Sequence, residues 1–146
     1  GENDNFDLKT SHFYPAIIRK LFESKISNSK TIKLWGTGKA KRELIYVKDV
    51  AKAVVYFMCK KTKHSLINIG TGQDKSIKEY AHFLRDFIYP KVKIIFDKST
   101  GDGTPRKLLD ITVAKKYGWQ AQTSLLEGTR LTINDFKKKN KKFNIN

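Results

Sequence analysis

Three short stretches of the sequence hold residues that could contact an anionic ligand. "SHFYP" puts His12 at the expected start of a helix, where N–H groups without intrahelical partners can meet an anion. "LWGTGKAKRE" carries Trp35 at a glycine turn and then Arg42, whose forked, always charged guanidinium suits a diphosphate. "STGDGTPRKLLD" sets Asp102 and two bases among glycines that let the backbone approach a ligand.

Each of these stretches also has a purely structural interpretation. His12 can serve only the helix start, Trp35 can be part of a strand's core, and Arg42 can form a surface ion pair. The glycine-rich loop can be a plain turn. The residues alone leave both interpretations open.

Several common sites are missing from the sequence. "GTGKAK" and "GTGQDK" begin as G-x-G without the third glycine of a dinucleotide-binding loop. His12, His64 and His82 are far apart and Cys59 is the single cysteine, so we expect no metal site. Cys59 lies in the apolar run "AVVYFMC" and is predicted to be an inert core thiol in a reducing cytoplasm.

Composition limits the class of protein. The chain has 146 residues with 39% hydrophobic residues, enough for one domain, and its apolar runs fall short of the roughly 20 residues of a membrane span. Its net charge is +16, but 25 of the 30 bases are lysines dispersed along the chain, whereas base readout favours arginine. We therefore expect neither nucleic acid nor membrane as a partner. A stand-alone basic module that binds nucleic acid or another polyanion stays the alternative.

Interleaved helical and strand patterns predict an α/β chain. A helix should follow "KTSH", with Thr10 or Ser11 as its N-cap, and "TIKLW", "ELIYV", "SLINI" and "VKIIF" read as strands. Asp49 is expected to cap a helix through "VAKAVVYFMC", which is apolar on most sides and should be buried.

The second half of the chain has clearer helix signals. Ser76 with Glu79, and Ser124 with Glu127, have the spacing of a capping box. Gly118 should end a short helix that follows Asp110, and the lysine-rich tail should fray.

The motifs together resemble a known family. "DNF" followed by "SH..PA.IRK", then "WGTG...RELIYV.DVA.A", "INIGTG" and "DGTPRKLLD", is similar to the C-terminal portion of the GDP-L-fucose synthases, extended short-chain dehydrogenase/reductases. The similarity runs to about Phe136. It implies an α/β substrate-binding lobe at 1–136, with segments that would complete an upstream Rossmann domain, and a Lys-rich tail at 137–146.

The resemblance also implies a reaction and site residues. The family uses NADP to convert GDP-4-dehydro-6-deoxy-D-mannose to GDP-L-fucose, by epimerisation at C3 and C5 and reduction at C4. It implies that His12 lies against NADP and transfers protons, and that Lys20, Trp35, Arg42 and Asp102 bind the GDP-sugar. It further implies a homodimer of the full-length enzyme. Another nucleotide-sugar epimerase or dehydratase is the alternative within this class.

Departures from the family pattern bear on these expectations. Lys20 stands where some relatives carry arginine, so a bidentate contact would be replaced by that of a single ammonium group. Gly101 stands where proline is usual. The chain opens without Met inside polar loop sequence, so we expect a fragment of a longer protein. The family's glycine-rich loop and catalytic Ser, Tyr and Lys would lie upstream of Gly1. We therefore expect the isolated chain to lack reductase activity.

Overall fold

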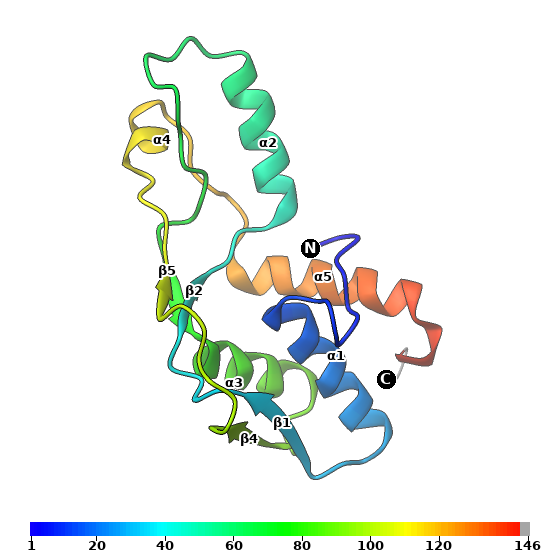
Figure 1. Cartoon of the computed structure of the whole chain (residues 1–146). Coiled ribbons are helices and arrows are strands. Elements are labelled where there is room, and N and C mark those ends of the chain that lie inside the picture. Colours follow the sequence, from blue (N-terminus) through cyan, green and yellow to red (C-terminus); the bar gives the residue numbers. More distant parts are fainter. Residues whose placement is uncertain (144–146) are drawn as a thin grey trace.

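Two small sheets organise the chain in this computed structural model, which describes residues 1–143. In the first, β1 (Thr31–Trp35) pairs in parallel with β4 (Lys93–Asp97), so that Ile32 lies opposite Ile94. In the second, β2 (Lys41–Glu43) lies between antiparallel β3 (Asp74–Ser76) and parallel β5 (Arg106–Lys107). Figure 1 shows the second sheet joining the part of the molecule around β1 and β4 to the part around α2 and α4.

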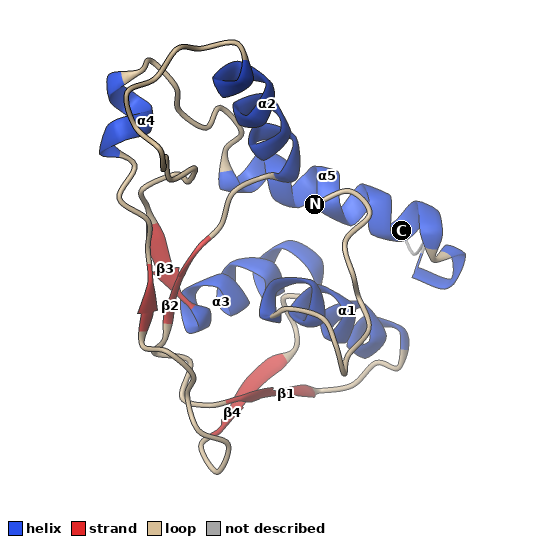
Figure 2. Ribbon diagram, turned by 45° about the horizontal axis from the view of Figure 1, so that its top comes forward, coloured by secondary structure: helices blue, strands red, loops and turns tan. Residues whose placement is uncertain are grey.

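Most of the hydrophobic core lies around the first sheet. Helices α1 (Phe13–Ile26) and α3 (Ile77–Ile88) pack against each other beside β1 and β4 (Figure 2). Helix α5 (Leu125–Lys139) completes the cluster, whose buried members include Leu21, Leu84 and Phe136. Burial of such side chains is the main favourable term in folding.

Several predicted boundaries are confirmed. Ser76 accepts a hydrogen bond from the Glu79 amide while the Glu79 side chain accepts one from the Ser76 amide, which completes a capping box. Ser124 accepts from the Glu127 amide at the start of α5, but the hydrogen bonds of residues 1–143 do not include the reciprocal one, so this end has a single cap and not the predicted capping box. Gly118, with φ of +84°, follows the end of α4 (Thr112–Lys116), a backbone conformation that favours glycine.

The expectation of a buried helix after Asp49 is wrong. Helix α2 (Val47–Met58) buries only Asp49 and Ala53, and Met58 is 79% exposed. Tyr46, not Asp49, occupies the N-cap position. One face of α2 packs on a small cluster with Ala114 and Trp119, and its other apolar side chains have no comparable partner among the described residues.

Two predicted strands are also wrong. In "ELIYV", only Glu43 belongs to β2 and α2 already begins at Val47, while "SLINI" (65–69) forms no strand in the described part of the chain. These segments have strand-like composition but no neighbouring ladder among residues 1–143, and a strand needs one. Cys59 is exposed, not in the core, because it follows the exposed end of α2.

The two ends of the fold differ from expectation as well. Helix α1 begins at Phe13 with His12 at the N-cap position, one or two residues later than predicted. The lysine-rich tail is helical as far as residue 143: α5 continues to Lys139 and a 3-10 helix (η1, Lys141–Phe143) follows. Phe143 is 1% exposed and stacks on Phe136, with ring centroids 4.9 Å apart. Residues 144–146 lie outside the described part.

Within residues 1–143, none of the helices combines the length and the apolarity that crossing a bilayer requires.

Candidate functional site

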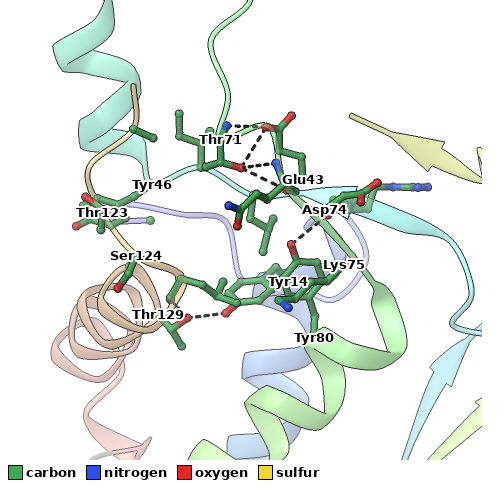
Figure 3. Close-up of a pocket in the computed structure, with 18 of the residues that line it drawn as sticks. Tyr14, Glu43, Tyr46, Thr71, Asp74, Lys75, Tyr80, Thr123, Ser124 and Thr129 are labelled. Atoms are coloured by element: carbon green, nitrogen blue, oxygen red, sulfur yellow. Dashed lines mark hydrogen bonds between the residues drawn. The ribbon is translucent and has the colours of Figure 1, made fainter. Parts of the chain in front are cut away.

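A cavity of about 780 Å³ lies between the start of α1, the second sheet and the start of α5. Segments distant in sequence meet there: residues 12–15, 42–46, 71–75 and 120–125 all contribute to its wall. Figure 3 shows side chains from these segments around the opening. The volume is in the range of small-molecule sites, and the wall combines aromatic rings with polar groups.

Arg42 and Glu43 enter this wall from β2. One Glu43 carboxylate oxygen accepts hydrogen bonds from the amides of Thr71 and Gly72, both at 2.6 Å, and the other accepts from the Leu109 amide at 3.0 Å. Glu43 therefore holds the turn at residues 70–72 and the segment after β5 against β2. The Tyr80 hydroxyl donates to the Arg42 carbonyl at 3.0 Å, which fixes the backbone of Arg42 from the α3 side.

The loop that carries Asp102 is attached to the turn between β1 and β2. Asp102 accepts from the Thr37 amide at 2.8 Å and from the Thr37 hydroxyl. These bonds hold the pKa of the Asp102 carboxyl below its ordinary value. The Arg42 guanidinium donates to the Thr104 carbonyl of the same loop at 2.7 Å. This stretch is therefore an attached wall segment, not a free turn.

Lys20 and Trp35 form a pair next to that turn. The Lys20 ammonium lies 5.9 Å from the centroid of the Trp35 ring and donates to the Lys33 carbonyl at 2.9 Å. Burial lowers the pKa of Lys20. Trp35 is 71% exposed at the end of β1, so it is not part of a strand's core and offers an aromatic face to a ligand.

His12 lies at the N-cap of α1, exposed, and makes no side-chain capping bond there. Its imidazole therefore lines the cavity without serving the helix start. The first amides of α1 are close by, as expected for a helix N-terminus.

The structure thus distributes the predicted site residues over two places. His12 and Arg42 line the cavity. Lys20, Trp35 and Asp102 gather around the β1–β2 turn and do not line it, although Arg42 reaches the loop of Asp102 through Thr104.

Three of the other four arginines are paired within the protein. Arg106 donates to Asp74 at 2.5 Å and lowers the pKa of that carboxyl, so it is not free for a ligand. Arg19 pairs with Glu23, and Arg85 with Asp86. Residues 1–143 contain no group of three or more His, Cys, Asp or Glu side chains that could hold a metal ion.

Sequence reasoning missed several residues that line the cavity or hold its wall in place. Glu43 lay in the motif "RELIYV", but its four donors come from segments that only the fold brings together. Asp49 is 1% exposed and accepts from the amides of Gln122 and Thr123, which fastens the segment before α5 to α2. Tyr14 and Thr129 also line the cavity, and no sequence pattern linked them.

Comparison with known proteins agrees with this architecture. Residues 1–70 match the model of the NAD dependent epimerase/dehydratase family. The probable GDP-L-fucose synthase 1 of Oryza sativa is 38% identical over 88% of this chain and 39% of that protein. The GDP-L-fucose synthase of Sinorhizobium fredii is 39% identical over 93% of this chain and 43% of that protein. The chain spans about two fifths of the length of these curated relatives.

Among solved structures, a GDP-mannoheptose C4 reductase from Campylobacter jejuni with NADP bound is 30% identical. It superimposes with a TM-score of 0.74 over 88% of this chain and 46% of that one. The fold is therefore that of the extended short-chain dehydrogenase/reductases. Within that class, the chain is related by sequence to the GDP-L-fucose synthases of the NAD-dependent epimerase/dehydratase family.

Proposed function

We propose that this chain is the substrate-binding part of an NADP-dependent GDP-L-fucose synthase, acting on GDP-4-dehydro-6-deoxy-D-mannose. The observation that carries the proposal is that His12 and Arg42 line one cavity. The three relatives described above share GDP as the nucleotide in their names, whereas the sugar differs between fucose and mannoheptose. The shared nucleotide supports GDP, and the assignment of fucose rests on the two curated relatives.

Each site residue has a role that its surroundings permit. Arg42 offsets diphosphate charge, and its contact with Thr104 places it beside the loop of Asp102. Lys20 adds a point charge next to Trp35, whose exposed face can stack on a ring. Asp102 keeps lone pairs beyond those bonded to Thr37, and these accept hydrogen bonds from the sugar or the nucleotide.

His12 is the residue proposed for proton transfer during epimerisation. Histidine suits this step because its charge changes near neutral pH, so it can act as the base that takes a proton from one face of a sugar carbon or as the acid that delivers one to the opposite face. The free imidazole at the cavity edge also fits contact with NADP, which supplies the hydride when bound. Beyond His12, the sequence has no complete G-x-G-x-x-G loop, so we propose that the rest of the cofactor contact comes from a part of the enzyme that this chain does not span.

The proposal is tested by titrating the purified chain with GDP and following the heat of binding. Arg42→Ala should weaken the binding free energy of GDP by about 1.5–3 kcal/mol, as expected for loss of a charge-assisted contact. Arg130→Ala is the matched control. Arg130 is exposed on α5 and does not line the cavity, so this substitution removes the same charge at a distance from the proposed site. Equal affinity of the Arg42 variant and the control would contradict the assignment.

A second test addresses the catalytic part of the proposal. We expect the purified 146-residue chain to show no NADPH-dependent turnover of the keto-sugar, since it spans only about two fifths of its curated relatives and we propose that the rest of the cofactor contact lies in the part that it does not span. Measurable turnover by this chain would contradict that expectation.

A further inference from the structure

A polar pair lies inside the cavity apart from the predicted site residues. The Tyr14 hydroxyl, from the first turn of α1, lies 2.6 Å from the Thr129 hydroxyl of α5 (Figure 3). Both residues line the cavity, and Thr129 is 1% exposed.

The direction of this hydrogen bond follows from counting protons. A hydroxyl has one proton to donate, and the Thr129 hydroxyl lies 2.6 Å from the Leu125 carbonyl, one turn earlier in α5. A carbonyl can only accept, so the Thr129 proton goes to Leu125. The Tyr14 proton must then go to Thr129.

This direction leaves the Tyr14 oxygen with lone pairs and no proton for a ligand. Among the hydrogen bonds of residues 1–143, none is donated to that oxygen. Burial raises the pKa of Tyr14 to about 12, so the hydroxyl keeps its proton at neutral pH and its donation to Thr129 persists.

The ring of Tyr14 is also held in place. It meets the rings of Phe13 and Tyr80 edge to face, with centroids 6.0 Å and 5.7 Å away. The Tyr80 hydroxyl is itself committed to the Arg42 carbonyl. Tyr14 is therefore an oriented acceptor, two residues from His12 on the same helix start.

We propose that Tyr14 is a specificity-determining residue that accepts a hydrogen bond from a hydroxyl of the sugar, oriented by Thr129. The inference rests on the proposed function, because it takes the sugar to lie beside His12. It predicts that the chain distinguishes a GDP-sugar from GDP partly through this one oxygen.

The test compares the affinities of GDP-L-fucose and GDP for the purified chain. Tyr14→Phe keeps the ring packing and removes the acceptor. The affinity for GDP-L-fucose divided by that for GDP should therefore fall about 3- to 10-fold, while the affinity for GDP itself changes less than about 2-fold. The ratio does not depend on how much of the sample is folded, so simple destabilisation would leave it unchanged.

Variants of Thr129 separate orientation from packing. Thr129→Val should lower the same ratio, Thr129→Ser should retain it, and adding Thr129→Val to Tyr14→Phe should have no further effect. If Tyr14→Phe does not fold, the contrast between the valine and serine variants decides the matter alone. An unchanged ratio with intact GDP binding would overturn the role of Tyr14. Failure of the unmodified chain to bind GDP at all would overturn the proposed function and this inference with it.

Discussion

Glu43 provides the sharpest stability prediction, because one carboxylate holds three segments together. It accepts from the amides of Thr71, Gly72 and Leu109 and from the Thr71 hydroxyl. Glu43→Ala removes every one of these acceptors. Glu43→Gln keeps one oxygen and loses the charge.

The size of the effect follows from which donors can turn to water. Hydrogen bonds to a charged group contribute about 1.5–3 kcal/mol each in stability. The bonds to Thr71 are part-buried, whereas those to Gly72 and Leu109 are exposed and can be replaced by water. We therefore expect Glu43→Ala to lower the free energy of unfolding by about 2–4 kcal/mol, less than the sum of the separate bonds. Glu43→Gln should cost about 1–2 kcal/mol, because it retains an acceptor for Thr71.

Urea unfolding followed by tryptophan fluorescence measures both variants on the same scale. The slope against urea should stay constant, so that the midpoint alone reports the loss. A loss below about 0.5 kcal/mol for Glu43→Ala would refute the reasoning, since that is the range of ordinary surface substitutions. Equal losses for alanine and glutamine would show that charge, not acceptor geometry, dominates.

Three further predictions concern other parts of the fold. Phe143→Ala should lower the free energy of unfolding by about 3 kcal/mol in the same assay, because the Phe143 side chain is 1% exposed and stacks on Phe136. An unchanged free energy of unfolding would contradict the packing of residue 143 on the core. Asp97 bonds to Lys33 and Ser99, which lowers the pKa of its carboxyl from 3.8 to about 2. Its stabilising contribution is therefore present above pH 3.8 and lost as the pH falls toward 2, so Asp97→Asn should flatten an acid titration of stability in that window, and an unchanged titration would contradict this. Asp49→Ala leaves the amides of Gln122 and Thr123 without their acceptor and should cost about 2–4 kcal/mol in thermal or urea unfolding; a loss within about 0.5 kcal/mol would contradict it.

Local signals in the sequence predict the starts of α3 and α5, where a serine is followed three residues later by a glutamate, whereas the single caps expected at Asp49 and at Thr10 or Ser11 are wrong. The bonds between Ser76 and Glu79 and between Ser124 and Glu127 are made within a few residues, so no distant partner is needed. The strand "TIKLW" was predicted with its full extent, because its alternation reflects one buried face.

The failures share a physical cause. "SLINI" and most of "ELIYV" have the composition of strands, and α2 has that of a buried helix, but strand pairing and helix burial depend on neighbours that composition does not specify. Phe143 was missed for the same reason, since its lysine-rich surroundings gave no sign of the aromatic rings that it meets.

For the candidate site, sequence and resemblance named residues but not their grouping. That His12 and Arg42 share a cavity, while Lys20 and Trp35 pair beside a turn, depends on contacts between distant segments. The hydrogen bond from Tyr14 to Thr129 joins residues that are 115 positions apart in the sequence, so no local pattern around either residue predicts it.

If this cavity belongs to a GDP-sugar site, the chain should discriminate between nucleotides. The purified chain would be titrated with GDP, UDP and dTDP under identical conditions by isothermal calorimetry. We expect GDP to bind most tightly. A preference for UDP or dTDP, or equal affinities for all three, would contradict it.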